Sequence, residues 1–586
     1  MLIVLSHCFF TAGSEMSRDE HMVVAAIDFG STYSGYAFQF RGSDKICSVS
    51  SFHGSTVTYK TPTVILFDKD KNFNSFGYQA ENKYAELAEE DNHYGWRNFG
   101  CFKMELYRMK DQKKPLRVTS KLKDDQGQTM DIIDVFGGAI KYLKDELLGT
   151  LLANAPRFEE NDVKWLITVP AIWEDAAKQI MILAAEKAGI ARAHLRLVYE
   201  PEAAAIFCKN EYSTAVDPRQ NDIFKPGSNF ILVDLGGGTV DITAHKVNDD
   251  GTLDALVPPS GGPWGGHNVN KKFFELLEDL FGTEVFRRFS AEEMDERLEL
   301  DRSFEVKKKQ DGQFSIKLPA RLIELAGVTK IKEIQHSQKV SFRKDKLFVN
   351  ATAVLGMYKE TIEHTIVHVS EILQKADLQN VSTIVLVGGF AESKILQQEV
   401  KRRFNPKKYL LVIPQAPELA VLKGAALYGL NESVIRSHRM PYTVGIDSAV
   451  EFVEGRHPVK LRYFQNGSFK CTGIFKVFIE RGIQIQPNTA SAEHKLRASN
   501  PEEAVIELYK SDRDDIPTYT EDCRRLGEVR LTLIAPTQAD QSKKDVSENQ
   551  NPVINVQMYF GDTFVTVKAV EDGTNNSIVA KINFLL

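Results

Sequence analysis

Two short glycine-containing motifs, far apart in the chain, constrain the fold more than any other feature of the sequence. The first is Asp28–Ser34 (DFGSTYS), which follows the apolar run 23–27. The second is Asp234–Asp241 (DLGGGTVD), which follows the apolar run 230–233. Each pattern predicts a buried strand, a tight turn that glycine makes sterically possible, and a second strand.

The residue types in these turns indicate a site for phosphate. Exposed backbone N–H groups and hydroxyls hold phosphate oxygens, and an aspartate at the end of a strand can hold a hydrated divalent cation. A single aspartate in this setting is more often a turn former than a metal ligand. Because the motif occurs twice, we favour the second interpretation. Two copies predict two similar halves that close on a nucleoside triphosphate and its metal.

Composition narrows the class of protein. A chain of 586 residues is long enough for about three or four folding units. The formal net charge of −6 gives no electrostatic reason to propose nucleic acid or an anionic membrane as a partner. No stretch approaches the ~20 apolar residues that a membrane span needs. The six cysteines never have CxxC spacing, so we expect neither a disulfide framework nor a zinc site. A reducing cytoplasm is the expected location.

Residue patterns along the sequence divide the chain into three parts. Residues 1–22 are interpreted as a disordered leader, with Met16 or Met22 as alternative starts; a signal peptide is the less favoured alternative because a basic n-region is missing. Residues 23–435 alternate strands and helices and predict an α/β fold. Residues 440–586 contain short alternating runs separated by turn residues. They predict a smaller antiparallel β-sandwich, with no helical segment after it.

Further elements of the α/β part are predicted from periodicity and stop signals. An apolar face recurs at helical spacing through residues 135–155. Three strands are expected, each ended by the residue that follows it: 165–169 before Pro170, 197–199 before Glu200, and 384–387 before Gly388. Expected helices are 174–189, ending at a glycine, and about 418–430.

The order of these motifs resembles the superfamily of actin, sugar kinases and 70 kDa heat-shock proteins, and the heat-shock branch most closely. That resemblance implies a two-lobed, actin-like ATPase fold with nucleotide in a central cleft. It covers residues 23–430 well and 440–586 weakly. The segments Glu200–Ala205 (EPEAAA) and Phe452–Pro458 (FVEGRHP) are similar to the divergent heat shock 70 kDa protein 12A/12B subgroup.

The resemblance implies five catalytic residues. Asp28 and Asp234 would hold Mg²⁺ through water, as this reluctantly dehydrating ion prefers. Glu200 matches the glutamate near the attacking water, and Asp241 matches a further acid. Lys103 matches the lysine that stabilises charge on the transferred phosphoryl group. The alternative for Lys103 is an ordinary surface lysine.

The resemblance also implies a set of contacts to ATP or ADP from turns and from one helix. Glu305 and Lys308 would grip ribose and adenine, or could form a solvated helical pair instead. Gly424 is interpreted as a helix-packing glycine. The expected nucleotide contacts are Gly30, Ser31, Thr32 and Tyr33; Gly236, Gly237, Gly238 and Thr239; Gly265 and Gly266; Glu305 and Lys308; Gly388, Gly389, Phe390 and Glu418. At Gly388 and Gly389 a Cβ is expected to collide with the ligand.

Some positions depart from the family pattern. Ser31 and Glu202 each stand where a threonine is usual, and Phe390 replaces a serine. Glu392 stands where an arginine normally packs on adenine, so affinity or selectivity for the base is expected to change. The segment 436–441 replaces an acidic, leucine-rich linker. We therefore expect weakened clamping of extended peptides and binding of folded partners by the C-terminal sandwich.

The favoured function is a slowly hydrolysing, ATP-binding protein of the heat-shock-70 type that acts as a monomer on protein clients or partners. A nucleotide exchange factor is one candidate partner, and no nucleic acid is expected. The alternatives are a small-molecule kinase of the same superfamily and a nucleotide-sensing scaffold with negligible turnover. The sequence contains no GxxxxGK[ST], HExxH or GxSxG motif, so other phosphate-binding and hydrolase frameworks have no support.

Overall fold

The chain forms two compact units, each described here by itself. The first contains Met1–Gly251 and Ser260–Val434, and the second contains Thr252–Pro259 and Ile435–Leu586. The computed structural model describes residues 21–43, 45–48, 51–53, 56–111, 116–154, 158–213, 222–335, 339–465, 467–487, 489–498, 500–533, 552–560, 565–574, 576–582 and 585. All but the last two residues of the expected leader lie outside these ranges.

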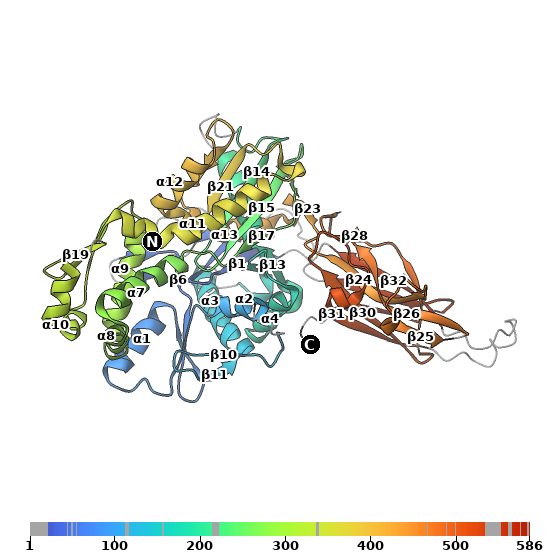
Figure 1. The fold of residues 1–586 in the computed structure, drawn as a ribbon, viewed down its shortest axis with the longest axis horizontal. Coiled ribbons are helices and arrows are strands. Elements are labelled where there is room, and N and C mark those ends of the chain that lie inside the picture. Colours follow the sequence, from blue (N-terminus) through green and yellow to red (C-terminus); the bar gives the residue numbers. More distant parts are fainter. Residues whose placement is uncertain are drawn as a thin grey trace. The chain divides into compact units, whose positions relative to one another are not determined.

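A central sheet forms the first half of the first unit, drawn in blue to teal (Figure 1). Its core strand β1 pairs antiparallel with β2 and parallel with β12, and β12 pairs parallel with β13. Every residue of β1 is buried, as expected for a strand with both faces covered. The short strands β3 and β6 both pair with β2. The strands are β1 (Val23–Phe29), β2 (Tyr33–Phe40), β3 (Cys47–Ser48), β6 (Thr61–Pro62), β12 (Val163–Val169) and β13 (Leu195–Tyr199).

The second half of this unit, in green to yellow, repeats the same order of pairing (Figure 1). Strand β14 pairs antiparallel with β15 and parallel with β21, and β21 pairs parallel with β22. The short strand β17 pairs with β15, as β6 pairs with β2. The two sequence motifs are therefore equivalent hairpins in two similar halves, as predicted. The strands are β14 (Asn229–Leu235), β15 (Val240–Val247), β17 (Ser260–Gly262), β21 (Thr383–Val387) and β22 (Leu410–Val412).

Helices cover these sheets and join the two halves. The helices are α1 (Tyr78–Glu89), α2 (Lys103–Asp111), α3 (Ile132–Asn154), α4 (Asp175–Lys187), α5 (Glu200–Ser213), α7 (His267–Phe281), α8 (Thr283–Glu292), α9 (Met294–Lys308), α10 (Ala320–Gln335), α11 (Ala351–Leu373), α12 (Lys394–Arg403) and α13 (Ala420–Leu430). Helices α5 and α13 cross closely at Gly424. A Cβ at this position would lie 1.7 Å from the carbonyl oxygen of Ala203, so the crossing requires glycine. Gly424 is thus a packing glycine, as the sequence indicated.

Small sheets complete the first unit. Their strands are β4 (Ser51–His53), β5 (Thr56–Thr58), β7 (Val64–Phe67), β8 (Phe73–Phe76), β9 (Arg97–Gly100), β10 (Lys121–Lys123), β11 (Thr129–Asp131), β18 (Phe314–Lys317), β19 (Val340–Arg343) and β20 (Lys346–Val349). The predicted helices match α3, α4 and α13 within a few residues. Glu418 is an exception, since it lies in a 3₁₀ turn, Pro417–Leu419, and not in the following helix.

The second unit is β-rich, as predicted, and consists mainly of two antiparallel sheets. One has the order β25-β26-β24-β30-β31, and the other has the order β28-β32-β33-β34 with β29 also on β32. Buried residues alternate along β32, so one face of that sheet forms the core. The strands are β16 (Leu253–Ala255), β23 (Ile435–Arg439), β24 (Thr443–Glu451), β25 (Arg462–Gln465), β26 (Ser468–Ile479), β27 (Gln484–Ile485), β28 (Thr489–Ala490), β29 (His494–Arg497), β30 (Glu503–Ser511), β31 (Arg524–Thr532), β32 (Val553–Phe560), β33 (Thr566–Glu571) and β34 (Ser577–Lys581).

The segment that replaces the family linker is a strand of this second unit. Strand β23 pairs parallel with β16 and antiparallel with β27. Arg436 Nε donates a hydrogen bond of 3.0 Å to Asp254, and the Ser437 hydroxyl donates one of 2.6 Å to the same carboxylate. Paired on both edges, this segment is ordered strand and not a free connection.

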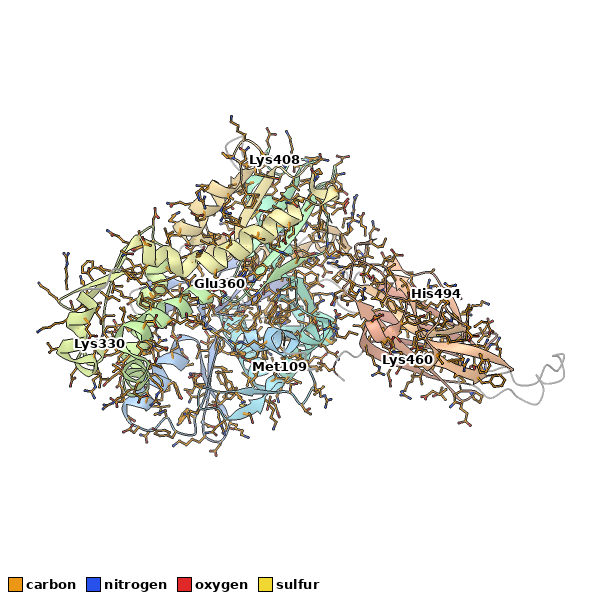
Figure 2. All side chains as sticks on the ribbon, in the orientation of Figure 1. Met109, Lys330, Glu360, Lys408, Lys460 and His494 are labelled. Carbon is orange, nitrogen blue, oxygen red and sulfur yellow. The ribbon has the colours of Figure 1, made fainter. Side chains whose placement is uncertain are left out.

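The described residues contain neither a membrane-spanning helix nor a disulfide bond. None of the described helices is long and apolar enough to span a bilayer. Five described cysteines are free thiols. Figure 2 shows the labelled Lys330 and Lys408 projecting from the periphery of the first unit, the usual position of a lysine. Lys103 and Lys308 are buried instead.

Candidate functional site

The turns of the two equivalent hairpins touch each other. A Cβ on Gly237 would lie 2.0 Å from the Thr32 hydroxyl oxygen, and a Cβ on Gly238 would lie 2.8 Å from the Ser31 hydroxyl oxygen. Glycine is therefore required in the second turn because the first turn occupies the space of a side chain. The structure brings the two predicted phosphate loops together at one place.

The segment after β6 holds the first turn in shape. The Thr63 hydroxyl donates to the Gly30 carbonyl at 2.8 Å, and the Thr63 amide donates to the Thr32 carbonyl at 2.8 Å. These bonds occupy the carbonyl groups of the turn. In the described part of the chain, nothing accepts a hydrogen bond from the Thr32 amide. That N–H remains a donor for an anion.

A similar arrangement holds the second turn. The Gly266 amide donates to the Gly236 carbonyl at 3.0 Å, and the His267 amide donates to the Gly237 carbonyl at 2.8 Å. The amides of Gly237 and Gly238 have no acceptor among the residues that the structure describes. Both turns thus use their carbonyls for the protein and leave N–H groups for a ligand, which is the polarity that phosphate requires.

Asp28, at the end of β1, is buried and fully engaged by two partners. Its Oδ1 accepts a hydrogen bond of 2.8 Å from the Thr168 hydroxyl, and its Oδ2 lies 2.6 Å from the Lys60 ammonium. Burial lowers the pKa of Lys60, but the charge and hydrogen bond of Asp28, together with the charges of Asp234 and Glu200, outweigh that effect, and the pKa is raised. Sequence reasoning missed both partners. Thr168 is a polar residue in the otherwise apolar run 165–169, two positions before the strand-ending Pro170, which is the signal in the sequence for this partner.

Asp234, at the equivalent end of β14, has a different environment. It is buried, and none of the ion pairs among the described residues includes it. Burial raises its pKa well above the ordinary value, and the charges of Glu200, Asp241 and Asp28 raise it further. Asp28 therefore lies close enough to Asp234 for its charge to act on that carboxyl group.

Lys103 and Glu200 form a buried ion pair beside these aspartates. The Lys103 ammonium lies 2.6 Å from Glu200 Oε1, and the Lys103 side chain is 2% exposed. The ammonium also lies 5.1 Å from the centre of the Trp173 ring. Burial raises the pKa of Glu200 to about 7, although Lys103 opposes the shift. The alternative of a surface lysine at position 103 is wrong.

Asp241 links the two halves of the unit. Its carboxylate accepts a hydrogen bond of 3.1 Å from the amide of Ile172, in the turn that follows β12. Burial raises its pKa, while the Ile172 amide and the Thr239 hydroxyl oppose that change by bonding to the charged form. Asp241 therefore lies on β15 of the second half but is held by a loop of the first.

Gly388 and Gly389 form the turn that follows β21 and have different surroundings. Gly388 has φ +88°, and its Cβ would lie 2.4 Å from the Leu235 carbonyl oxygen and 2.6 Å from Asp234. A Cβ on Gly388 would thus collide with the protein itself, whatever the ligand, and the expected collision with a ligand stays a prediction. Among the residues that the structure describes, nothing lies within 4 Å of a Cβ on Gly389. That side of the turn faces open space.

The loop of Gly265 and Gly266 packs between the second hairpin and Phe390. A Cβ on Gly265 would lie 2.3 Å from the Gly237 carbonyl oxygen, and one on Gly266 would lie 3.1 Å from the Phe390 ring. Phe390 is buried, and its ring stacks on Tyr358 with centroids 6.1 Å apart. The Phe390 ring therefore completes the protein packing beneath this loop.

Glu305 and Lys308 are held in place on α9. The Lys308 ammonium lies 2.7 Å from Glu305 Oε1 and donates a 2.8 Å hydrogen bond to the Asn270 amide oxygen. Lys308 is buried, so the alternative of a solvated helical pair is wrong. Tyr33 of the first turn lies close enough for the charge of Glu305 to raise the Tyr33 pKa, after burial itself.

Two further acids lie near the Gly388 turn. Within the described ranges, Glu418 Oε2 is buried without a hydrogen-bond partner. Glu392 pairs with Lys309 at 2.7 Å. The carboxylate of Glu392 is therefore neutralised by its neighbour, and Glu418 retains a free acceptor.

The charge of the site fits a divalent cation and a polyphosphate. Four acids, Asp28, Glu200, Asp234 and Asp241, act on one another, while two lysines, Lys60 and Lys103, are paired with them. The carboxylates exceed the ammonium groups, and hard carboxylate oxygens suit Mg²⁺. Asp28 and Asp234 are the residues that would hold it through water. The described residues include no direct cluster of three or more His, Cys, Asp or Glu ligands.

Comparisons with known proteins agree with this geometry. The family model described as Hsp70 protein matches residues 24–438. Human heat shock 70 kDa protein 12A is 30% identical, over 99% of this chain and 94% of the relative. Human heat shock 70 kDa protein 12B is 29% identical, over 96% of this chain and 91% of the relative. The chaperone protein HscA homolog of Rickettsia prowazekii (strain Madrid E) is 24% identical, over 71% of this chain and 56% of the relative.

The family model matches residues 24–438, the range that contains both halves, and the similarity to heat shock 70 kDa protein 12A extends over nearly the whole chain. The α/β unit therefore has the actin-like ATPase fold of the family, and a β-rich unit accompanies it. The chain belongs to the Hsp70 protein family.

Proposed function

We propose that this protein binds ATP with Mg²⁺, hydrolyses it slowly and uses the cycle to act on protein partners. The observation that carries the proposal is the contact between the two hairpin turns, with Asp28 and Asp234 in one electrostatically coupled site. Family membership supports the ATPase at the coarser level.

The turns supply the groups that bind phosphate. The amides of Thr32, Gly237 and Gly238 donate to phosphate oxygens, and the hydroxyls of Ser31 and Thr32 lie at the same place. The bound Mg²⁺ supplies positive charge to the phosphate oxygens. Glu305, Lys308 and Glu418 would contact the ribose and base.

Hydrolysis would be an in-line attack of water on the terminal phosphate. Glu200 has a pKa of about 7, near the working pH, which suits a group that orients water and accepts its proton. Lys103 is fixed by its ion pair with Glu200, so its ammonium is in place to stabilise charge on the transferred phosphoryl group. Asp241 adds a further acid, held by the Ile172 amide.

The proposed partners are proteins, bound through the β-rich region 440–586. A similar protein is called a chaperone, the HscA homolog of Rickettsia prowazekii. Strand β23, in place of a free connection, supports the prediction that clamping of extended peptides is weakened and that folded partners bind instead. We also propose a cytoplasmic, monomeric protein that a nucleotide exchange factor could serve.

The test is single-turnover release of phosphate from radiolabelled ATP. Asp28→Asn and Asp234→Asn are each expected to lower the rate at least ~100-fold. The exposed Asp377→Asn, outside the site, is the matched control and should leave the rate unchanged. Release at the wild-type rate by both site variants would remove the proposed mechanism.

One alternative, a nucleotide-sensing scaffold with negligible turnover, has a specific observation in its favour. Phe390 is buried against Tyr358, and Glu392 is neutralised by Lys309, so the base side differs from the family pattern. Tight binding of ATP with no ADP after prolonged incubation would favour the scaffold over the ATPase.

A further inference from the structure

Lys60 approaches the phosphate end of the site from the residue that precedes a short strand beside the first hairpin. It stands immediately before β6, whose Thr61 and Pro62 pair with Ser34 and Tyr33 of β2. The next residue of β2 is Gly35, which is the cross-strand partner of Asp28. Lys60 therefore lies beside the residue opposite Asp28.

A glycine at position 35 makes room for the lysine side chain. A Cβ there would lie 2.7 Å from the Tyr59 carbonyl oxygen and 3.1 Å from Lys60 Cγ. With that space free, the aliphatic stem of Lys60 crosses the hairpin and its ammonium reaches Asp28 Oδ2 at 2.6 Å. The Lys60 side chain is only 19% exposed. The two hairpin strands and the residue before β6 together form this arrangement, with Asp28 on β1 and Gly35 on β2.

The ammonium of Lys60 faces the reacting end of the site. Asp28 is its one hydrogen-bond acceptor within the described part of the chain. A lysine ammonium has three N–H donors, so two remain for a ligand. The carboxylates that act on it besides Asp28 are Asp234 and Glu200, which mark the metal side and the attacking-water side. A terminal phosphate placed between these groups lies within reach of Lys60.

We propose that Lys60 is a ligand of the terminal phosphate of the bound nucleotide, held in place by Asp28. This inference rests on the proposed function, since it concerns the same polyphosphate. Lys60 gives the first half of the site a positive charge of its own, where the second half relies on the metal. The site then distinguishes a nucleoside triphosphate from a diphosphate by direct contact.

The test measures binding, not turnover. Affinities of ATP, ADP and inorganic tripolyphosphate are measured by calorimetry for the wild type and Lys60→Met, with Mg²⁺ and with chelator. Lys60→Met is expected to weaken ATP and tripolyphosphate at least ~10-fold, and ADP less than ~3-fold, because a charge-assisted hydrogen bond to the terminal phosphate is lost. The ATP loss should be larger without Mg²⁺, and Lys60→Arg should recover most of it.

A matched control is available on the neighbouring strand β12. Lys164 is 18% exposed and pairs with Glu432 at 2.5 Å, so Lys164→Met removes a lysine of the same exposure from an ion pair outside the site. Its ATP, ADP and tripolyphosphate affinities should equal those of the wild type. Thermal melting of each variant separates loss of fold from loss of contact.

Several outcomes would overturn the inference. Unchanged ATP affinity in Lys60→Met would do so, and so would equal losses for ATP and ADP, which indicate a structural role. A failure of the proposed function looks different: the wild type would bind neither ATP nor ADP. If the wild type bound tripolyphosphate but neither nucleotide, and Lys60→Met abolished that binding, Lys60 would still be supported as a polyphosphate ligand.

Discussion

The two halves of the first unit have the same strand pairing, but they surround their equivalent aspartates with different side chains. In the first half, Asp28 faces Gly35 across the hairpin and receives the ammonium of Lys60 and the hydroxyl of Thr168. Both carboxylate oxygens have a donor. The charge of this aspartate is compensated by the protein.

In the second half, the corresponding positions have no cation. Asp234 faces Asp241 across its hairpin, and its partner on the parallel strand β21 is Val387. The flanking strand β17 places Gly261 opposite Asp241, where the first half has Lys60 near Gly35. A lysine and a threonine in one half are thus replaced by a glycine and a valine in the other.

The two halves show that the same strand topology does not determine which side chains, and hence which chemistry, surround an aspartate. Backbone pairing makes two equivalent turns, and the side chains around each aspartate decide which half carries unbalanced negative charge. The raised pKa of Asp234 and the stable ion pair of Asp28 are the physical result. A hydrated cation would be drawn to the second half, and the first half presents a lysine.

The largest expected effect on stability comes from substituting the first glycine of each turn, Gly30 and Gly236. A Cβ on Gly30 would lie 2.1 Å from the Tyr33 carbonyl oxygen, whereas one on Gly236 would lie 3.0 Å from the Thr239 carbonyl oxygen. Gly30→Ala should lower the free energy of unfolding by about 4 kcal/mol, and Gly236→Ala by about 1 kcal/mol, because only the second clash is relieved by a small shift. Denaturant unfolding measures both, and equal losses would show that the turns are equally tight.

Local patterns in the sequence predicted the hairpins and most of the site. The order of aspartate, glycines and hydroxyls determines each turn within a few residues, and strand-ending Pro170 and helix-starting Glu200 could be placed in the same way. These features depend on short stretches of chain. The family resemblance assigned Lys103 and Glu200 to one catalytic centre, but it did not predict the ion pair between them.

Contacts between distant segments could not be predicted. Lys60 and Asp28 are separated by 32 residues, and their pairing depends on β6 joining β2 at one register. Arg436 and Asp254 are 182 residues apart, so the sequence placed a linker at 436–441 and could not predict that residues up to Arg439 form a strand. The displacement of Glu418 into a 3₁₀ turn depends on the Gly388 amide, which donates to the Pro417 carbonyl.

The next effect is the pH dependence that the unbalanced acids impose. Glu200 has a pKa of about 7 against an ordinary 4.5, so between these pH values the folded protein holds a proton that the unfolded chain has released. Stability should therefore fall as pH rises through this window, by about 3 kcal/mol in the nucleotide-free protein. Denaturant unfolding at pH 5, 6, 7 and 8 measures the slope. Glu200→Gln should flatten it, and an unchanged slope in that variant would place the proton elsewhere.

Equivalent Asp→Asn substitutions should change stability in opposite directions at pH 8. Asp28→Asn leaves the Lys60 ammonium without a counter-charge and should destabilise the protein by about 2 kcal/mol. Asp234→Asn removes a buried carboxylate from among other carboxylates and should stabilise it by about 1 kcal/mol.

Chemical denaturation without nucleotide provides both numbers. Asp28→Asn combined with Lys60→Met should recover part of the loss, since no charge is then left unpaired. Changes of the same sign in the two single variants would mean that the halves are not electrostatically different.

The smallest effect concerns the residues on the neighbouring parallel strands. Thr168→Val removes the 2.8 Å hydrogen bond to Asp28 and should cost about 1 kcal/mol of stability at pH 8. Val387→Thr places a hydroxyl at the equivalent position beside Asp234, where a new hydrogen bond offsets the cost of burying it, so the change should stay within about 0.5 kcal/mol. If Val387→Thr destabilised the protein as much as Thr168→Val, its hydroxyl would be unable to reach Asp234. The two aspartates would then differ in strand geometry as well as in their partners.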